Sequence, residues 1–281
     1  MRKKIAVEIT QATESIRRMR GTSEPHLMRC ADGELYVVKF LNNPQHPRIL
    51  INELLCAQLA RRLGLPVPPP MLVEVSPELI QHSRSLYMER GVKPGPCASG
   101  LHFASRYPGR PQETLVVDFL PDKYLRRVRN PEAFLGALVF DKWTCNCDGR
   151  QMVFHRHVKG RGSAYNVLMI DHGFCFNGGE WKFPDSPIRS VYQRRVVYDS
   201  VQGLESFEPF LSSVEGLEEA ELQEFAANIP EEWYDGKRND LDRLIEDLFR
   251  RRRRVRQAIL DTKNCELRPF PNWSLTAVLP K

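Results

Sequence analysis

The feature that most constrains the fold is a short apolar segment that contains one lysine. Residues 34–40, ELYVVKF, are rich in β-branched and aromatic side chains and follow the turn-forming pair Asp32-Gly33, a pattern that predicts a strand. Lys39 has apolar neighbours on both sides, and burying a charge is costly unless an opposite charge accompanies it. The segment therefore predicts a sheet and an acidic partner for Lys39, unless Lys39 faces solvent from an edge strand.

The flanking residues predict a second strand, a helix and the acidic partner. HLMRC at 26–30 follows the polar breaker GTSEP and is expected to pair with the lysine strand as a hairpin. Beyond that strand, apolar residues recur at helical spacing until Gly64, which is followed by prolines and ends the helix. Glu53 is one of the few acids on this helix, so an ion pair between Lys39 and Glu53 is predicted.

Further strands are expected along the chain. Residues 71–75 and 113–121 have strand composition, whereas 83–111 is rich in Gly, Pro, Ser and Arg and is expected to be mostly loop. The sequences QMVFHRHV and AYNVLMID, within 151–171, bracket the turn KGRGS and predict a hairpin.

The remaining elements are predicted to be helices. Asn130 is expected to cap a helix, with Pro131 at its first position, and the C-terminal part should end in a long amphipathic helix around 240–260. This order indicates an α+β fold in two lobes, a β-rich N-terminal lobe with one major helix and a mainly helical C-terminal lobe. We place these lobes at 1–121 and 122–281.

Composition restricts the setting and the partners. The seven cysteines are an odd number scattered through the chain, which argues for reduced thiols in a cytoplasmic protein. No apolar run approaches the ~20 residues that span a bilayer, and the N-terminus lacks the apolar core of a secretory signal. The net charge of +6 includes a dense arginine run at 250–256, expected to be a solvated helical face, with nucleic acid as the alternative partner.

Two aspartates stand at positions that suit catalysis. Asp148 lies in the polar loop NCDGRQ between the predicted helix and the hairpin, and Asp171 ends the second hairpin strand. Each aspartate alone is also compatible with an ordinary turn residue. Together with Lys39 and Glu53 they match the needs of phosphoryl transfer from ATP: a cation for the phosphates, a carboxylate for magnesium and a group that orients the acceptor.

These residues resemble the HipA-like kinases, distant relatives of protein kinases and phosphoinositide kinases. The resemblance is carried by GTSEPHLMR, YVVKFLNNPQ, NELLCAQLARRLGLPVP, DKWTCNCDGRQ and MIDHGFCF, which cover much of residues 21–176. It implies a protein-kinase-like fold and an ATP- and Mg²⁺-dependent kinase that phosphorylates an unknown protein Ser/Thr or small-molecule hydroxyl. Asp148 would position that hydroxyl, and Asp171 would bind Mg²⁺.

The same resemblance implies how the nucleotide is held. The turn with Gly21 and Ser23 would overlie the phosphates, with backbone amides and the serine hydroxyl as donors. Lys39, held by Glu53, would contact the phosphates. The connecting strand at 113–121 would hold the adenine by backbone contacts near Phe119.

The sequence departs from the family pattern in the catalytic loop. The family usually has a metal-binding Asn five residues after the catalytic Asp, and Val153 occupies that position here. Gln151 or Asn146 would then supply the second metal contact, and Gln151 is also expected to take part in catalysis. Arg150 stands where a histidine is common. These departures leave two alternatives to the kinase: a nucleotide-binding pseudokinase or adaptor, and an enzyme that transfers AMP on the same fold.

Overall fold

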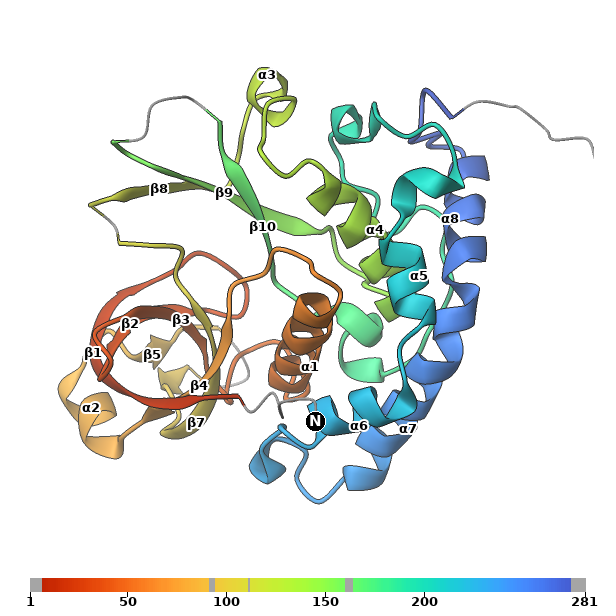
Figure 1. Ribbon diagram of the computed structural model, residues 1–281. Helices are drawn as coiled ribbons and strands as arrows, with labels where there is room; N and C mark the ends of the chain where they lie inside the picture. Colours follow the sequence, from red (N-terminus) through yellow and green to blue (C-terminus); the bar gives the residue numbers. More distant parts are fainter. Residues whose placement is uncertain (1–6, 91–93, 111, 160–163, 274–281) are drawn as a thin grey trace, which may run out of the picture.

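The computed structural model describes residues 7–90, 94–110, 112–159 and 164–273. Its fold is of mixed α and β type: a small closed barrel packs through one helix against a larger, mostly helical part (Figure 1). The elements that surround Lys39 come from both of these parts.

The barrel contains five strands, one of them in a segment that the sequence predicts as loop. β1 (Ile9–Arg18), β2 (His26–Cys30), β3 (Leu35–Lys39), β7 (Gly100–Arg106) and β4 (Pro70–Val75) follow one another in the sheet, and β4 returns to β1 in parallel. The barrel therefore closes where the sequence predicts only a hairpin-like start. β7 lies inside residues 83–111, which the sequence predicts to be mostly loop. The prediction differs from the structure because the short apolar run of β7 is flanked by glycine, proline and arginine.

Alternation along β3 separates two environments. Tyr36, Val38 and Phe40 point into the barrel, whose apolar interior also contains Met28 and Val73. Lys39 lies on the other face, turned towards α1. α2 (Pro77–His82) lies against β1, and the short strands β5 (Tyr87–Met88) and β6 (Gly95–Pro96) pair with each other.

Helix α1 (Ile49–Arg62) ends as predicted, at Gly64, which adopts a left-handed φ of 73°. All residues from Ile49 to Ala60 are buried, and the apolar side chains from Leu50 onward belong to one core that continues into the helical part through Phe140 and Leu241. α1 is thus enclosed between the barrel and the helices (Figure 1). This enclosure explains why even its polar residues are buried.

A second sheet of three strands has the order β10-β9-β8. β9 (Gln151–His157) and β10 (Asn166–Ile170) form the predicted hairpin, and β8 (Thr114–Val117) pairs with β9. The connecting strand predicted at 113–121 therefore belongs to this second sheet. The chain leaves the barrel between β7 and β8, and a division of the lobes at residue 121 stays a prediction.

The α-helices that follow α1 and α2 are α3 (Asp122–Leu125), α4 (Glu132–Thr144), α5 (Phe210–Glu215), α6 (Glu219–Ala226), α7 (Arg238–Arg251) and α8 (Val255–Asn264). Asn130 does not cap α4, since its amide makes two hydrogen bonds with the backbone of Val167 in β10. The predicted long C-terminal helix is interrupted by a 3₁₀ turn, Arg252–Arg254.

The arginine run at 250–256 is largely engaged within the chain. Arg251 is buried and pairs with Asp185, while Arg256 pairs with Glu208 and Glu215. Arg250, Arg253 and Arg254 are exposed, so part of the run forms the predicted solvated face. In the part of the chain that the structure describes, no helix has the length and apolar character needed to cross a membrane.

Candidate active site

Lys39 lies at the centre of a buried group of three charges. Its Nζ is 2.5 Å from Oε1 of Glu53 and 2.9 Å from Oδ1 of Asp171. Lys39 ends β3, Glu53 lies in the second turn of α1, and Asp171 follows β10. Three elements distant in sequence therefore meet at one cation, and the ion pair predicted between Lys39 and Glu53 is present.

Burial and opposite charge compete in setting the pKa values of this group. Burial alone would lower the pKa of Lys39, but the charges of Asp171 and Glu53 outweigh it and raise that pKa. Burial raises the pKa of Glu53, and the Lys39 charge offsets only part of this. Burial acts in the same direction on Asp171, yet the Lys39 ammonium holds the pKa of Asp171 well below its usual range. At neutral pH, Lys39 is therefore a cation and Asp171 a carboxylate.

The turn at Asp171 brings this carboxylate out of a buried strand end. Asp171 adopts a left-handed φ of 60°, which a short polar side chain tolerates better than most. At Gly173, an added Cβ would lie 3.0 Å from Cγ2 of Ile49 and 3.3 Å from Oε1 of Glu53, so the close approach to α1 favours glycine. The Asp171 side chain is 29% exposed, against 2% for Glu53, so Asp171 is the carboxylate that a ligand can reach.

Asp148 lies in a loop that is held on both sides. The Cys147 amide donates to the carbonyl of Phe174 at 3.1 Å, beyond the Asp171 turn. Asn146 is buried, and its Oδ1 accepts from the Asp148 amide at 3.2 Å. Asp148 itself is exposed, and its Oδ1 accepts from the Gly149 amide at 2.7 Å. One carboxylate oxygen thus shapes the loop, and we expect the other to meet the acceptor.

Arg150 connects this loop to the strand end that carries Asp171. Its guanidinium forms a two-point ion pair with Asp141 of α4, both side chains being almost completely buried. Its Nη1 donates to the carbonyls of Ile170 and Asp171 at 2.7 and 2.9 Å. The sequence marks Arg150 only as a replacement for histidine, so the structure adds this connection to the predicted site.

Arg150→Met is expected to destabilise the fold by about 3–5 kcal/mol, because it leaves the Asp141 carboxylate buried without its cation. Urea unfolding measures the loss. The double variant Arg150→Met with Asp141→Leu removes both charges and should recover part of it. A loss below about 1 kcal/mol for Arg150→Met would show that the buried pair is not needed.

The register of β9 and β10 distinguishes the candidates for a second metal ligand. Val153 pairs with Leu168 inside the sheet, so this position belongs to a strand and not to the loop. Gln151 begins β9 opposite Ile170, the residue before Asp171, and its side chain is exposed. Asn146 is buried, with Nδ2 donating to Asp141 and Oδ1 engaged by the Asp148 amide. Gln151 is therefore the better placed of the two predicted substitutes.

The residues predicted on the nucleotide side take up the following positions. The turn with Gly21 and Ser23 joins β1 to β2, and it is closed by a hydrogen bond from the Glu24 amide to the carbonyl of Gly21 at 3.3 Å. Ser23 is buried. Phe119 is exposed after β8, with the Arg194 guanidinium 5.0 Å from its ring centroid. Nucleotide contacts by Gly21, Ser23 and Phe119 stay predictions.

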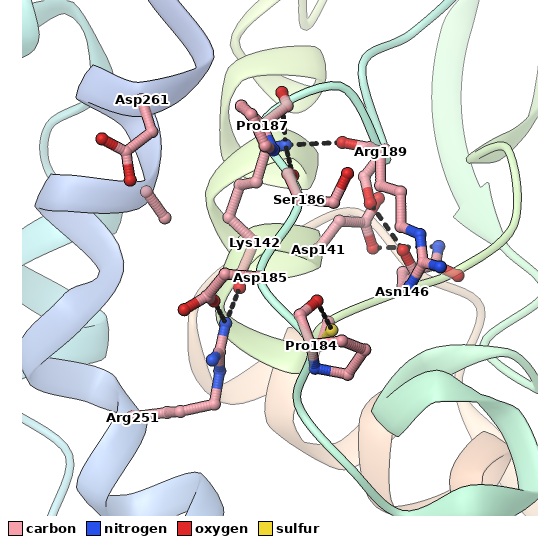
Figure 2. A pocket seen from close by; sticks show the side chains of 13 residues that line it. Asp141, Lys142, Asn146, Pro184, Asp185, Ser186, Pro187, Arg189, Arg251 and Asp261 are labelled. Carbon is pink, nitrogen blue, oxygen red and sulfur yellow. Dashed lines mark hydrogen bonds and ion pairs between the residues drawn. The ribbon is translucent and has the colours of Figure 1, made fainter.

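The segment at 184–190 lies beside Lys142 and Asn146 (Figure 2), and Asn146 belongs to the loop that carries Asp148. Buried Lys142 donates to three carbonyls of this segment, at 2.9 Å (Ser186), 2.9 Å (Pro187) and 2.6 Å (Arg189). Burial lowers the pKa of Lys142 to about 8. The Ser190 hydroxyl donates to the carbonyl of Asn146 at 2.8 Å. The chain after the Asp171 turn therefore braces the loop that carries Asp148.

The donor set fits a nucleotide-bound Mg²⁺ better than a structural metal centre. Among residues 7–90, 94–110, 112–159 and 164–273, no three His, Cys, Asp or Glu side chains gather as a metal-binding group. Mg²⁺ is commonly held by one or two carboxylates together with substrate phosphates and waters. Asp171, with Gln151 as the predicted second ligand, would hold the ion, and Lys39 supplies the neighbouring positive charge.

Comparison with known proteins shows a family and a fold to which this chain is similar. The family described as HipA-like kinase matches residues 12–259. The fold is similar to that of a Golgi casein kinase (TM-score 0.53, 10% identity, covering 92% of this chain and 74% of the other). It is also similar to the Helicobacter pylori proinflammatory kinase CtkA (TM-score 0.50, 14% identity, 89% and 98%). No curated protein sequence matches the chain significantly.

Proposed function

Because the chain belongs to the HipA-like kinase family, we propose that it transfers the γ-phosphoryl group of ATP to a hydroxyl group in a Mg²⁺-dependent reaction. The observation that carries the proposal is the buried Lys39, held between Glu53 and Asp171. A lysine fixed by two carboxylates on different elements offers a preorganised cation for phosphates. A Golgi casein kinase of similar fold is described with Mn and ADP bound, which supports nucleotide and metal binding on this fold.

The residues would divide the work as follows. Lys39 binds phosphate oxygens, and Glu53 keeps the ammonium oriented. Asp171 and Gln151 would hold the Mg²⁺, which would neutralise charge on the phosphates. Asp148 accepts the hydrogen bond of the acceptor hydroxyl and orients its oxygen towards the γ phosphorus. It takes the hydroxyl proton as the new oxygen–phosphorus bond forms and the bond from the γ phosphorus to the bridging oxygen breaks, which releases ADP. The acceptor is a Ser/Thr side chain of a protein or a small-molecule hydroxyl.

Labelled ATP tests this proposal against AMP transfer. The protein is incubated with Mg²⁺ and ATP labelled at either the γ or the α phosphate, with a mixture of candidate protein acceptors. Transfer of the γ label alone supports a kinase, and transfer of the α label alone means AMP transfer. Nucleotide binding without transfer or hydrolysis would instead support a pseudokinase, the alternative favoured by Val153 at the usual Asn position.

Lys39→Met is expected to lower turnover by about 10²–10³-fold, because it removes a charge that faces the phosphates while keeping the length of the stem. Glu53→Gln should cause a smaller loss of about 10-fold, since the lysine remains but is less well held. Steady-state kinetics at saturating Mg²⁺ measure both. The matched control is Arg61→Met, which removes an exposed cation from α1 and should leave turnover unchanged. Equal turnover in Lys39→Met and wild type would exclude the assigned role.

Gln151→Ala is expected to raise the Mg²⁺ concentration needed for half-maximal turnover by about 10-fold, because water must replace one protein oxygen beside Asp171. A Mg²⁺ titration at fixed ATP measures the shift. His157→Ala, at the far end of β9, is the matched exposed control. Unchanged Mg²⁺ dependence in folded Gln151→Ala would remove Gln151 from the metal site.

A further inference from the structure

Next to Glu53 on α1 lies a buried amide whose hydrogen bonds all go to one segment. Asn52 is fully buried, and its Nδ2 is 2.7, 2.9 and 3.1 Å from the carbonyl oxygens of Gly173, Gly178 and Cys175. Its Oδ1 accepts from the indole Nε1 of Trp181 at 2.9 Å. All four partners follow Asp171 in the chain, so one side chain gathers residues 173–181 against the helix.

Asn52 and Glu53 hold consecutive residues of the Asp171 turn. The Glu53 carboxylate accepts from the His172 amide at 3.1 Å, and the Asn52 amide donates to the carbonyl of Gly173. The same Glu53 oxygen also binds Lys39. Two neighbouring side chains of α1, the acceptor Glu53 and the donor Asn52, therefore fix the backbone after Asp171 to the helix. This arrangement sets the direction in which the Asp171 side chain leaves its strand.

Arg48 holds Trp181 in place, and Trp181 in turn orients the Asn52 amide. The Arg48 guanidinium lies 4.1 Å from the centroid of the Trp181 ring, and its Nη1 donates to the carbonyl of Gly179 at 3.0 Å. Its Nη2 pairs with Asp240 of α7 at 2.6 Å. Because Trp181 donates to Oδ1, the Asn52 NH₂ group must face the three carbonyls, and the flipped amide is excluded.

We infer that Asn52 is a positioning residue for catalysis, which aligns Asp171 with Glu53 and Lys39, and that Trp181 fixes its orientation. This inference rests on the proposed function, because the group to be aligned is the Asp171 carboxylate, which is proposed to bind the metal. Groups behind a metal ligand commonly change metal affinity or activity by about 10–100-fold when lost. Errors of about 1 Å in a reacting group can cost about 10²-fold.

The simpler interpretation is that Asn52 only stabilises the fold, and α1 offers a matched residue that separates the two. Gln58 is also a buried amide on α1, and it too bonds to the helical part: Nε2 donates to the carbonyl of Phe225 at 3.2 Å. It lies six residues, or about 9 Å, further along the helix and away from the Asp171 turn. A purely structural loss should therefore be similar for Asn52 and Gln58.

The experiment compares Asn52→Leu, Trp181→Phe and Gln58→Leu by urea unfolding and by Mg²⁺ titration of turnover on the folded protein. Asn52→Leu is expected to raise the Mg²⁺ requirement and lower kcat by about 10–100-fold, and Trp181→Phe by about 10-fold. Gln58→Leu should lose stability but keep both kinetic values. Trp181→Phe removes the indole donor and keeps an aromatic ring, so it decides the question if Asn52→Leu does not fold. Equal kinetics in Trp181→Phe and wild type, or equal kinetic losses in Gln58→Leu, would overturn the inference.

A readout independent of turnover separates this inference from the proposed function. Native-state hydrogen exchange reports the His172 amide, whose bond to Glu53 depends on the alignment. Trp181→Phe should speed exchange at His172 by about 10-fold, whereas Gln58→Leu should change it no more than its loss of global stability requires. If wild type transfers no phosphate yet this pattern holds, the proposed function fails and the alignment stands. If wild type is active and His172 exchange is unaffected, only the positioning role fails.

Discussion

Asp171→Asn is expected to abolish Mg²⁺-dependent phosphoryl transfer, with a loss of at least about 10³-fold. Asp171 is the more accessible carboxylate of the Lys39 group, and its substitution removes a full charge from the ligands of the metal. The amide also weakens the 2.9 Å contact that helps to hold Lys39. Turnover at saturating ATP and a Mg²⁺ titration of nucleotide binding measure the two consequences separately.

The control for this variant is Asp199→Asn, a partly exposed aspartate that pairs with Arg126 on the surface of the helical part. It should retain wild-type turnover, because surface ion pairs contribute at most about 1 kcal/mol to stability. Asp171→Asn should remain folded, since Lys39 keeps its contact with Glu53. Mg²⁺-dependent binding of ATP equal to that of wild type would show that Asp171 is not the metal ligand.

Part of the site was predictable because two of its charged residues, Lys39 and Glu53, lie in segments with a strong local pattern. Lys39 lies in an apolar strand and Glu53 on a largely apolar and basic helix, so burial of either charge favours an ion pair with the other. Two apolar segments around a turn predict the β9–β10 hairpin. These patterns are local in sequence, and the ion pair between Lys39 and Glu53 follows from their opposite charges.

The rest depends on long-range contacts that leave no local pattern. The sequence predicts mostly loop where β7 lies, because only the pairing of β7 with β3 and β4 stabilises it as a strand. Asn130 looks like a helix cap, but in the fold its amide pairs with β10. Asn52 and Arg150 bind backbone carbonyls, which every residue has, so no partner could be identified for either side chain from the sequence.

The position of Val153 changes how the departure from the family pattern should be interpreted. A strand residue paired with Leu168 is fixed by the sheet, so restoring an amide by Val153→Asn would place it on β9 and not in the catalytic loop. The loop itself is closed earlier, where Arg150 binds the carbonyls of Ile170 and Asp171. The absent asparagine is therefore weaker support for a pseudokinase than the sequence alone suggests.

Asp148→Asn is expected to lower turnover by about 10²–10⁴-fold while leaving ATP binding unchanged, the range typical of losing a positioned base. The substitution is close to isosteric, and an asparagine Oδ1 can still accept from the Gly149 amide at 2.7 Å, so the loop should keep its shape. What is lost is the capacity to take a proton from the acceptor hydroxyl.

Comparing kcat with the dissociation constant for ATP tests this assignment, because the loss should fall almost wholly on kcat. Cys147→Ser is the neighbouring control: it keeps the backbone bond from residue 147 to the carbonyl of Phe174 and should stay near wild-type activity. A folded Asp148→Asn protein with turnover within about 3-fold of wild type would exclude Asp148 as the base. Loss of ATP binding in this variant would instead assign Asp148 to the metal, beside Asp171, and would leave the proton acceptor to be found elsewhere in the loop.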